Sequence, residues 1–125
     1  MIDLSVRSTR KELLDDFQGT SKQLKTVLED INRVNRLLGG NVITVDAVFR
    51  LIKENEQKSY TILDVGCGDG NMLRQIAIKA RKRSISLKLI GLELSDGSLN
   101  IARQKSTHFP EIQYLNQDVF TLDKL

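Results

Sequence analysis

Apolar residues in the first third of the chain recur at helical spacing. Between positions 21 and 37 they fall at i, i+3, i+4 and i+7, so they would form one stripe along a helix. The members of the stripe are Leu24, Val27, Leu28, Ile31, Val34 and Leu37. Ser21 is a residue type that caps helices, and the pair Gly39-Gly40 can end one because glycine accepts positive φ. The pattern predicts an amphipathic helix from about Ser21 to Gly39.

Two further helices are predicted beside this one. A short helix is expected from about Thr9 to Phe17. Another is expected after Thr44, a second capping residue type, with an inward side made of Val45, Val48, Phe49 and Ile52. Three helices within 58 residues are too few to form a hydrophobic core of their own. We therefore interpret residues 1–58 as an N-terminal helical cover that packs on the rest of the chain.

From Tyr60 onward, short apolar runs alternate with helical patterns. Strands are predicted over residues 61–65, 87–92 and 112–115, and helices over about 71–83 and 97–107, the second of them capped by Ser95. This alternation is typical of a parallel sheet built from βαβ crossovers. The predicted fold class is α/β, with residues 59–125 forming the N-terminal part of a doubly wound, Rossmann-like sheet of three strands.

The first strand and its helix are joined by a glycine loop within the stretch YTILDVGCGDGNML, residues 60–73. Gly66, Gly68 and Gly70 stand at alternate positions. Glycine lets the backbone turn sharply and lets a ligand approach without a Cβ in the way, and the loop leads to the exposed N–H groups of a helix N-terminus. The dinucleotide fingerprint G-x-G-x-x-G would place its third glycine where Asn71 stands, which disfavours a nicotinamide cofactor.

Each predicted strand also has an acidic residue at or near its carboxyl end, where a doubly wound sheet faces its ligand. These residues are Asp64, Glu93 and Asp118. A carboxylate in the place of Glu93 can accept both hydroxyls of a ribose, but it can also be a solvent-exposed charge at a strand end. Asp118 is open to a second interpretation as well, because aspartate often forms turns.

The pattern D-x-G-x-G-x-G at residues 64–70, followed by Glu93 and Asp118, resembles motifs I, II and III of the class I S-adenosylmethionine-dependent methyltransferases. The resemblance covers about residues 60–118. It implies that Asp64 holds the methionine ammonium group, directly or through water, and that the glycine loop passes beside the methionine and the ribose. It also implies that Glu93 binds the ribose hydroxyls and that Asp118 binds the adenine amino group.

The same resemblance places Leu94 and Val119 against the adenine, and it implies no metal and names no catalytic residue. The segments RKELLDD at 10–16 and INRVNRLLGG at 31–40 are similar to the start of small-molecule methyltransferases found near bacterial type III polyketide synthases, whose first helices cover the cofactor pocket. Arg36 would then reach the methionine carboxylate. As an alternative, it is an exposed arginine on the polar side of its helix.

Composition and charge limit the classes of partner that are expected. The net charge of +3 is too mild to indicate nucleic acid by itself, and the basic run Lys79–Arg83 is interpreted as cations at a helix C-terminus. No apolar run is long enough to span a membrane, so no membrane partner is expected. The single cysteine, Cys67, excludes an internal disulfide and favours a reducing, cytoplasmic compartment. Within its loop, Cys67 is interpreted as a small residue rather than a nucleophile.

The resembled family has seven strands in the order 3-2-1-4-5-7-6, and only three are predicted here. We therefore expect a truncated, cofactor-binding half that is inactive alone. It should self-associate, either through the open edge of its first strand or by exchange of the N-terminal helices. The expected function is methyl transfer from S-adenosylmethionine, with S-adenosylhomocysteine as product, to a small molecule such as a phenolic or polyketide oxygen. The alternatives are RNA or protein methylation, or a non-catalytic S-adenosylmethionine-binding module.

Overall fold

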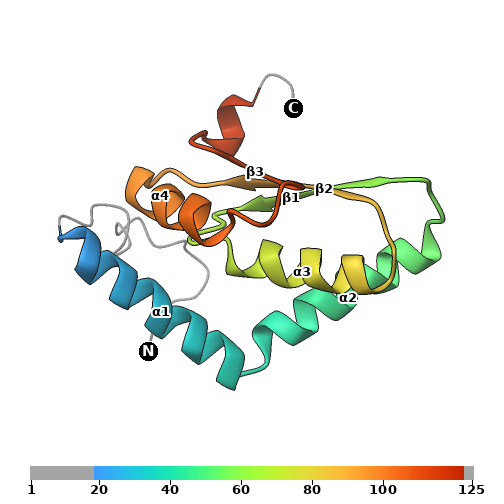
Figure 1. Ribbon diagram of the computed structural model, residues 1–125, viewed down its shortest axis with the longest axis horizontal. Coiled ribbons are helices and arrows are strands. Elements are labelled where there is room, and N and C mark those ends of the chain that lie inside the picture. The colour runs from blue at the N-terminus through green and yellow to red at the C-terminus, as the bar shows by residue number, and fades with distance from the viewer. Residues whose placement is uncertain (1–18, 123–125) are drawn as a thin grey trace, which may run out of the picture.

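A three-stranded parallel sheet forms the frame of the molecule (Figure 1). The computed structural model describes residues 19–122. The strands are β1 (Tyr60–Val65), β2 (Leu87–Leu92) and β3 (Ile112–Leu115), with β2 between the other two. In the register of the sheet, Asp64 lies beside Gly91, and Gly91 lies beside Tyr114. The predicted strands and their order are confirmed, and all three carboxyl ends lie at the same end of the sheet.

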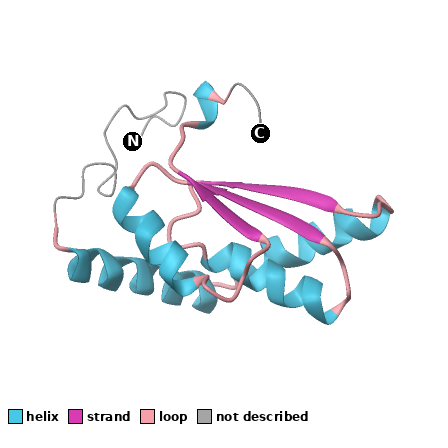
Figure 2. Cartoon of the chain, turned by 45° about the horizontal axis from the view of Figure 1, so that its top comes forward, coloured by secondary structure: helices cyan, strands magenta, loops and turns pink. Residues whose placement is uncertain are grey.

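All four α-helices of the described chain lie on one side of this sheet (Figure 2). They are α1 (Ser21–Leu37), α2 (Gly40–Glu54), α3 (Asn71–Lys82) and α4 (Asp96–Lys105). Helices α3 and α4 are the crossover connections between strands. A short 3₁₀ helix, η1 (Val119–Thr121), follows β3. The predicted helix over residues 9–17 lies outside the described residues. No helix among the described residues is long and apolar enough to cross a membrane.

Helix α1 is capped by Thr20, so the prediction that Ser21 is its cap is wrong. The Oγ1 atom of Thr20 accepts the N–H of Gln23 at 3.3 Å, while Oε1 of Gln23 accepts the N–H of Thr20 at 2.8 Å. This reciprocal pair is a capping box, which needs a Glu or Gln three residues after the cap. Ser21 has Leu24 at that position, so only Thr20 can form the pair.

The prediction that Thr44 caps the next helix is also wrong. Gly39 ends α1 with a φ of 72°, and α2 begins at the following residue. Thr44 therefore lies inside α2, where its hydroxyl donates to the carbonyl oxygen of Gly40 at 3.1 Å. The single left-handed glycine turns the chain between two helices that a longer loop was expected to separate.

The main core lies between the sheet and helices α2, α3 and α4. Its buried side chains include Phe49, Leu73, Ile76, Leu89, Leu99 and Tyr114. Helix α1 packs differently, because its buried Leu24 and Leu28 form a separate small cluster with Ile101 of α4. The two described helices of the N-terminal segment are therefore not equivalent: α2 is part of the main core and α1 lies outside it.

Gly91, in the central strand, marks a point of very close packing in this core. A Cβ at this position would lie 2.7 Å from Sγ of Cys67 and 2.9 Å from side-chain atoms of both Leu73 and Tyr114. Contacts this short are overpacked, so the glycine is what allows the loop, α3 and β3 to meet over β2.

Gly91→Ala should therefore lower the free energy of unfolding by about 1–3 kcal/mol, the usual cost of overpacking a core. Gly40→Ala is the matched control, since a Cβ there would meet only the carbonyl oxygen of Asn35 at 3.8 Å. Urea denaturation of both variants and the parent measures the difference. Equal stability of the two variants would contradict the packing argument.

Candidate cofactor site

The loops after β1 and β2 are held together by the carboxylate of Glu93. Its Oε2 atom accepts the N–H of Gly68 at 3.1 Å, and its Oε1 atom accepts the N–H of Ser95 at 2.9 Å. Glu93 follows β2 directly, so the strand fixes the position of its backbone. The two N–H groups fix the position of its carboxylate. Glu93 thus lies beside the glycine loop, and its role toward a ribose stays a prediction.

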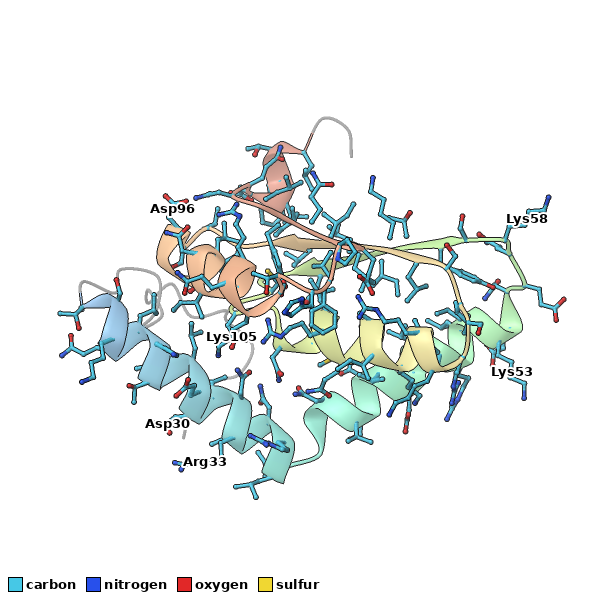
Figure 3. The ribbon with its side chains drawn as sticks, in the orientation of Figure 1. Asp30, Arg33, Lys53, Lys58, Asp96 and Lys105 are labelled. Carbon is cyan, nitrogen blue, oxygen red and sulfur yellow. The ribbon has the colours of Figure 1, made fainter. Side chains whose placement is uncertain are left out.

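The loop after β3 is tied to the same region through Asn116. Its Nδ2 atom donates to the carbonyl oxygen of Leu94 at 3.3 Å and to Oδ1 of Asp96 at 2.6 Å. Figure 3 labels Asp96 at the start of α4. The side chain of Leu94 is 64% exposed at this rim. Three successive loops at the carboxyl ends of the strands are thus linked side by side.

Asp118 caps η1 in this structure. Its Oδ1 atom accepts the N–H of Phe120 at 2.9 Å, and its own carboxylate is partly buried. Val119, the first residue of η1, is partly buried as well. The turn-forming role weighed for Asp118 is therefore real, and its role toward adenine stays a prediction.

Asp64 lies in β1, partly buried, at the base of the site. Burial raises the pKa of its carboxyl group above the ordinary value, and the negative charge of Glu93 raises it further. Within the described residues no cation forms an ion pair with either carboxylate. Two neighbouring carboxylates without a cation make this end of the sheet electrostatically suited to a positively charged group.

The three loop glycines all have positive φ, but they serve different purposes. A Cβ on Gly66 would meet nothing within 4 Å, and one on Gly68 would be in ordinary contact with Leu28. A Cβ on Gly70, in contrast, would lie 2.0 Å from Oη of Tyr114. The space beside Gly66 is therefore open and Gly68 faces Leu28 of α1, whereas Gly70 makes room for a core tyrosine.

Asp69 is a site residue that the sequence reasoning missed, although it stands inside the motif. Its side chain is only 3% exposed. Its Oδ1 atom accepts the N–H of Asn71 at 3.1 Å, and its Oδ2 atom accepts from Nζ of Lys105 at 2.8 Å and from Nδ2 of Asn32 at 2.9 Å. Figure 3 labels Lys105 on α4, above α1.

Asp69 stays ionised despite its burial. Burial raises its pKa, but the hydrogen bonds from Lys105 and Asn32, with the charges of Lys105 and Arg74, outweigh that effect and hold the pKa below the ordinary value. The available signal in the sequence was an acidic residue between two motif glycines, but its partners Lys105 and Asn32 lie 36 and 37 positions away from it. Asp69 is therefore a structural carboxylate, unlike Asp64.

Cys67 is buried against Gly91. Burial raises the pKa of its thiol to about 12, and the nearby Asp64 and Glu93 charges contribute to the increase. A thiol with this pKa is almost wholly protonated at neutral pH and is a poor nucleophile. The geometry agrees with the interpretation of Cys67 as a small loop residue.

Arg36 lies on the exposed side of α1, where it lines a polar groove of about 510 Å³. The groove also includes Asp69, Asn71, Arg74 and Lys105. The basic run at the end of α3 is engaged elsewhere. Its Lys79 pairs with Asp46, and Arg81 pairs with Glu111 at 2.7 Å. These two cations form ion pairs with other parts of the chain, whereas the sequence predicted only cations at the end of a helix.

Comparison with known families gives a match over the second half of the chain. A family model described as "Methyltransferase domain" matches residues 62–125. The matched segment begins in β1 and includes the glycine loop, Glu93 and Asp118.

Individual proteins agree with this match. A 2-phytyl-1,4-naphtoquinone methyltransferase of Thermosynechococcus vestitus is 34% identical over 62 residues, which is 50% of this chain and 26% of that protein. A candidate S-adenosyl-L-methionine-dependent methyltransferase of Methanococcus maripaludis superposes with a TM-score of 0.58 at 16% identity, covering 94% of this chain and 48% of that one. The plantazolicin methyltransferase BpumL, solved with S-adenosylhomocysteine, gives 0.52 at 18% identity, covering 82% and 36%. The chain thus spans about a quarter of the curated relative and at most about half of these structures.

The raised pKa of Asp64 leads to a stability prediction. An acid whose pKa is raised on folding stabilises the protein below its ordinary pKa, and this contribution is lost as the pH rises through the raised value. Asp64→Asn removes the charge, so the variant should unfold at a higher temperature than the parent at pH 7. The gap should shrink as the pH falls. Calorimetric melting across pH 3–8 tests this, with Glu56→Gln, an exposed carboxylate, as control. A gap that does not depend on pH would exclude the proposed cause.

Proposed function

This chain belongs to the methyltransferase domain family, and we propose that it forms the cofactor-binding part of an S-adenosylmethionine-dependent methyltransferase. The observation that carries the proposal is the carboxylate of Glu93, which joins the glycine loop to the loop after β2 through the N–H groups of Gly68 and Ser95. Asp64 lies beside it, and the loop after β3 is linked to the same rim.

The residues present fit this cofactor. Each carboxylate oxygen of Glu93 uses one N–H in the structure, and a carboxylate oxygen has capacity for a second donor, so both can still accept a ribose hydroxyl. Asp64 would accept the ammonium group of the methionine moiety, whose positive charge offsets the repulsion between Asp64 and Glu93. The open space beside Gly66 leaves room for the ligand to approach the backbone.

The adenine end would be bound by the remaining predicted residues. Leu94, exposed at the rim, supplies an apolar surface for the ring, and Val119 would close its other side. Asp118 would accept the adenine amino group with the oxygen that does not cap η1. Bound S-adenosylmethionine supplies an electrophilic methyl group, so the main contribution of these residues is to position and orient it.

We propose a small molecule as the methyl acceptor. Support comes from the relative named as a quinone methyltransferase and from the structural neighbour named for plantazolicin. RNA or protein methylation and a non-catalytic binding module are the alternatives. The pairing of Lys79 and Arg81 with acidic side chains gives no specific support to an RNA surface.

The division into an N-terminal helical cover, residues 1–58, and a cofactor-binding part, residues 59–125, is likewise a proposal. The separate, small cluster that holds α1 supports this division. The burial of α2 in the main core argues against a sharp boundary at residue 58. We place the protein in the cytoplasm on the basis of its single cysteine, which is buried as a free thiol.

Isothermal titration calorimetry with S-adenosylhomocysteine and with NAD tests the proposed function. The protein should bind the former and not the latter. In the same experiment Glu93→Ala should weaken S-adenosylhomocysteine binding by about 1.5–3 kcal/mol, the value for hydrogen bonds to a charged group. Glu56→Ala, an exposed carboxylate on the connector before β1, should bind like the parent.

The result that would end the cofactor assignment is NAD binding without any response to S-adenosylhomocysteine. If the parent binds S-adenosylhomocysteine and Glu93→Ala binds it equally well, the pocket lies elsewhere on the molecule.

We also propose that the chain self-associates through β1. Among the described strands β1 is paired on one side only, and Val65 is 54% exposed. A strand with free backbone groups and apolar side chains invites pairing with a second copy. Light scattering should therefore show oligomers at high concentration, and Thr61→Lys, which adds a charge to the exposed edge, should reduce them. A parent that stays monomeric would refute this.

A further inference from the structure

One line of side chains on helix α1 faces the glycine loop and the start of α4. Leu24, Leu28 and Asn32 are spaced at i, i+4 and i+8, so they share one side of the helix. A Cδ atom of Leu24 lies 2.7 Å from the position of a Cβ on Gly97, and one of Leu28 lies 3.8 Å from that position on Gly68. The first two contacts of this line are therefore apolar, and each is made to the start of α4 or to the glycine loop.

The third contact is polar. Nδ2 of Asn32 donates to Oδ2 of Asp69 at 2.9 Å. The acceptor is also held by groups outside α1, because the N–H of Asn71 and Nζ of Lys105 donate to the same carboxylate at 3.1 and 2.8 Å. Asp69 therefore presents a buried, oriented and charged acceptor to whatever covers the glycine loop.

The two kinds of contact differ in what they can specify. Apolar burial is non-directional, so two leucines hold a helix down without fixing its position along its axis. A hydrogen bond to a charged acceptor is directional and costly to leave unmade. A single polar contact within an apolar interface can therefore set the register of a helix.

We propose that the Asn32–Asp69 hydrogen bond is a latch that fixes the register of α1 over the glycine loop, which makes both residues positioning residues for cofactor binding. The inference rests on the proposed function of the loop. With the latch formed, Leu28 lies over the side of Gly68 where a Cβ would stand, and the N–H of Gly68 donates to Glu93. The position of α1 is thereby transmitted to the carboxylate that would bind the ribose.

Helix α1 is held by few buried side chains, so it can move without disrupting the main core. Its buried cluster with Ile101 is separate from the main core, so α1 can detach locally at a smaller cost than global unfolding. Gly39, with its φ of 72°, stands between α1 and α2, where a change of backbone angles would swing α1 while leaving α2 in the core.

A matched pair of variants on α1 tests the latch. Asn32→Ala removes the donor to Asp69, while Asn35→Ala removes an exposed amide of the same helix. Hydrogen–deuterium exchange should speed up over residues 21–37 and 66–70 in Asn32→Ala only. Binding of S-adenosylhomocysteine, measured by calorimetry, should weaken about tenfold in Asn32→Ala and stay unchanged in Asn35→Ala. Asn32→Asp, which opposes two carboxylates, should have the larger effect on both measurements.

The results distinguish a failure of the latch from a failure of the proposed cofactor-binding function. If the parent fails to bind S-adenosylhomocysteine, the proposed function is wrong, and the exchange data still decide whether the latch holds α1. If Asn32→Ala exchanges like Asn35→Ala, there is no latch. Faster exchange of α1 with unchanged affinity would show that the contact is structural and would overturn its positioning role.

Discussion

The register of three parallel strands determines where this protein can bind a ligand. Because β1, β2 and β3 run in the same direction and pair with their ends level, the residues that follow them emerge at one end of the sheet. The glycine loop, Glu93 and Asn116 are thereby close enough for direct hydrogen bonds between successive loops. That register depends in turn on close packing in the middle of the sheet, where Gly91 leaves room for Cys67 and Tyr114.

Two aspartates of the same motif have opposite electrostatic environments. Asp64 is partly buried beside Glu93, and its pKa is raised; Asp69 is more deeply buried among Lys105, Arg74 and Asn32, and its pKa is lowered. The first arrangement is unfavourable until a cation arrives, which is the condition of a binding group. The second is already satisfied by the protein, which is the condition of a structural group. The motif thus combines a carboxylate that has no cation among the described residues with one that the protein already binds.

Local patterns were sufficient for the elements and their order, because alternating apolar runs and the βαβ rule leave few arrangements for β1, β2 and β3. They were insufficient wherever the deciding partner is distant in the sequence. Gly70 was interpreted as a ligand-facing glycine, but Tyr114, 44 positions later, occupies the space that its missing Cβ leaves. Asp69 drew no attention because its partners Asn32 and Lys105 lie 37 and 36 positions away, separations that no short motif records. The cap of α1 was misplaced by one residue because the capping box of Thr20 and Gln23 was overlooked.

If the carboxyl ends of the three strands form the cofactor site, S-adenosylhomocysteine should change the surroundings of the residues there. The most direct test is a titration of the ¹⁵N-labelled protein with S-adenosylhomocysteine, followed by amide chemical shifts. The largest changes are expected at Gly66, Gly68, Glu93 and Ser95, with smaller ones after β3 near Asp118. Changes confined to the groove between α2 and α3, lined by Val45, Ile78 and Lys82 among others, would contradict this expectation, as would a spectrum that does not respond.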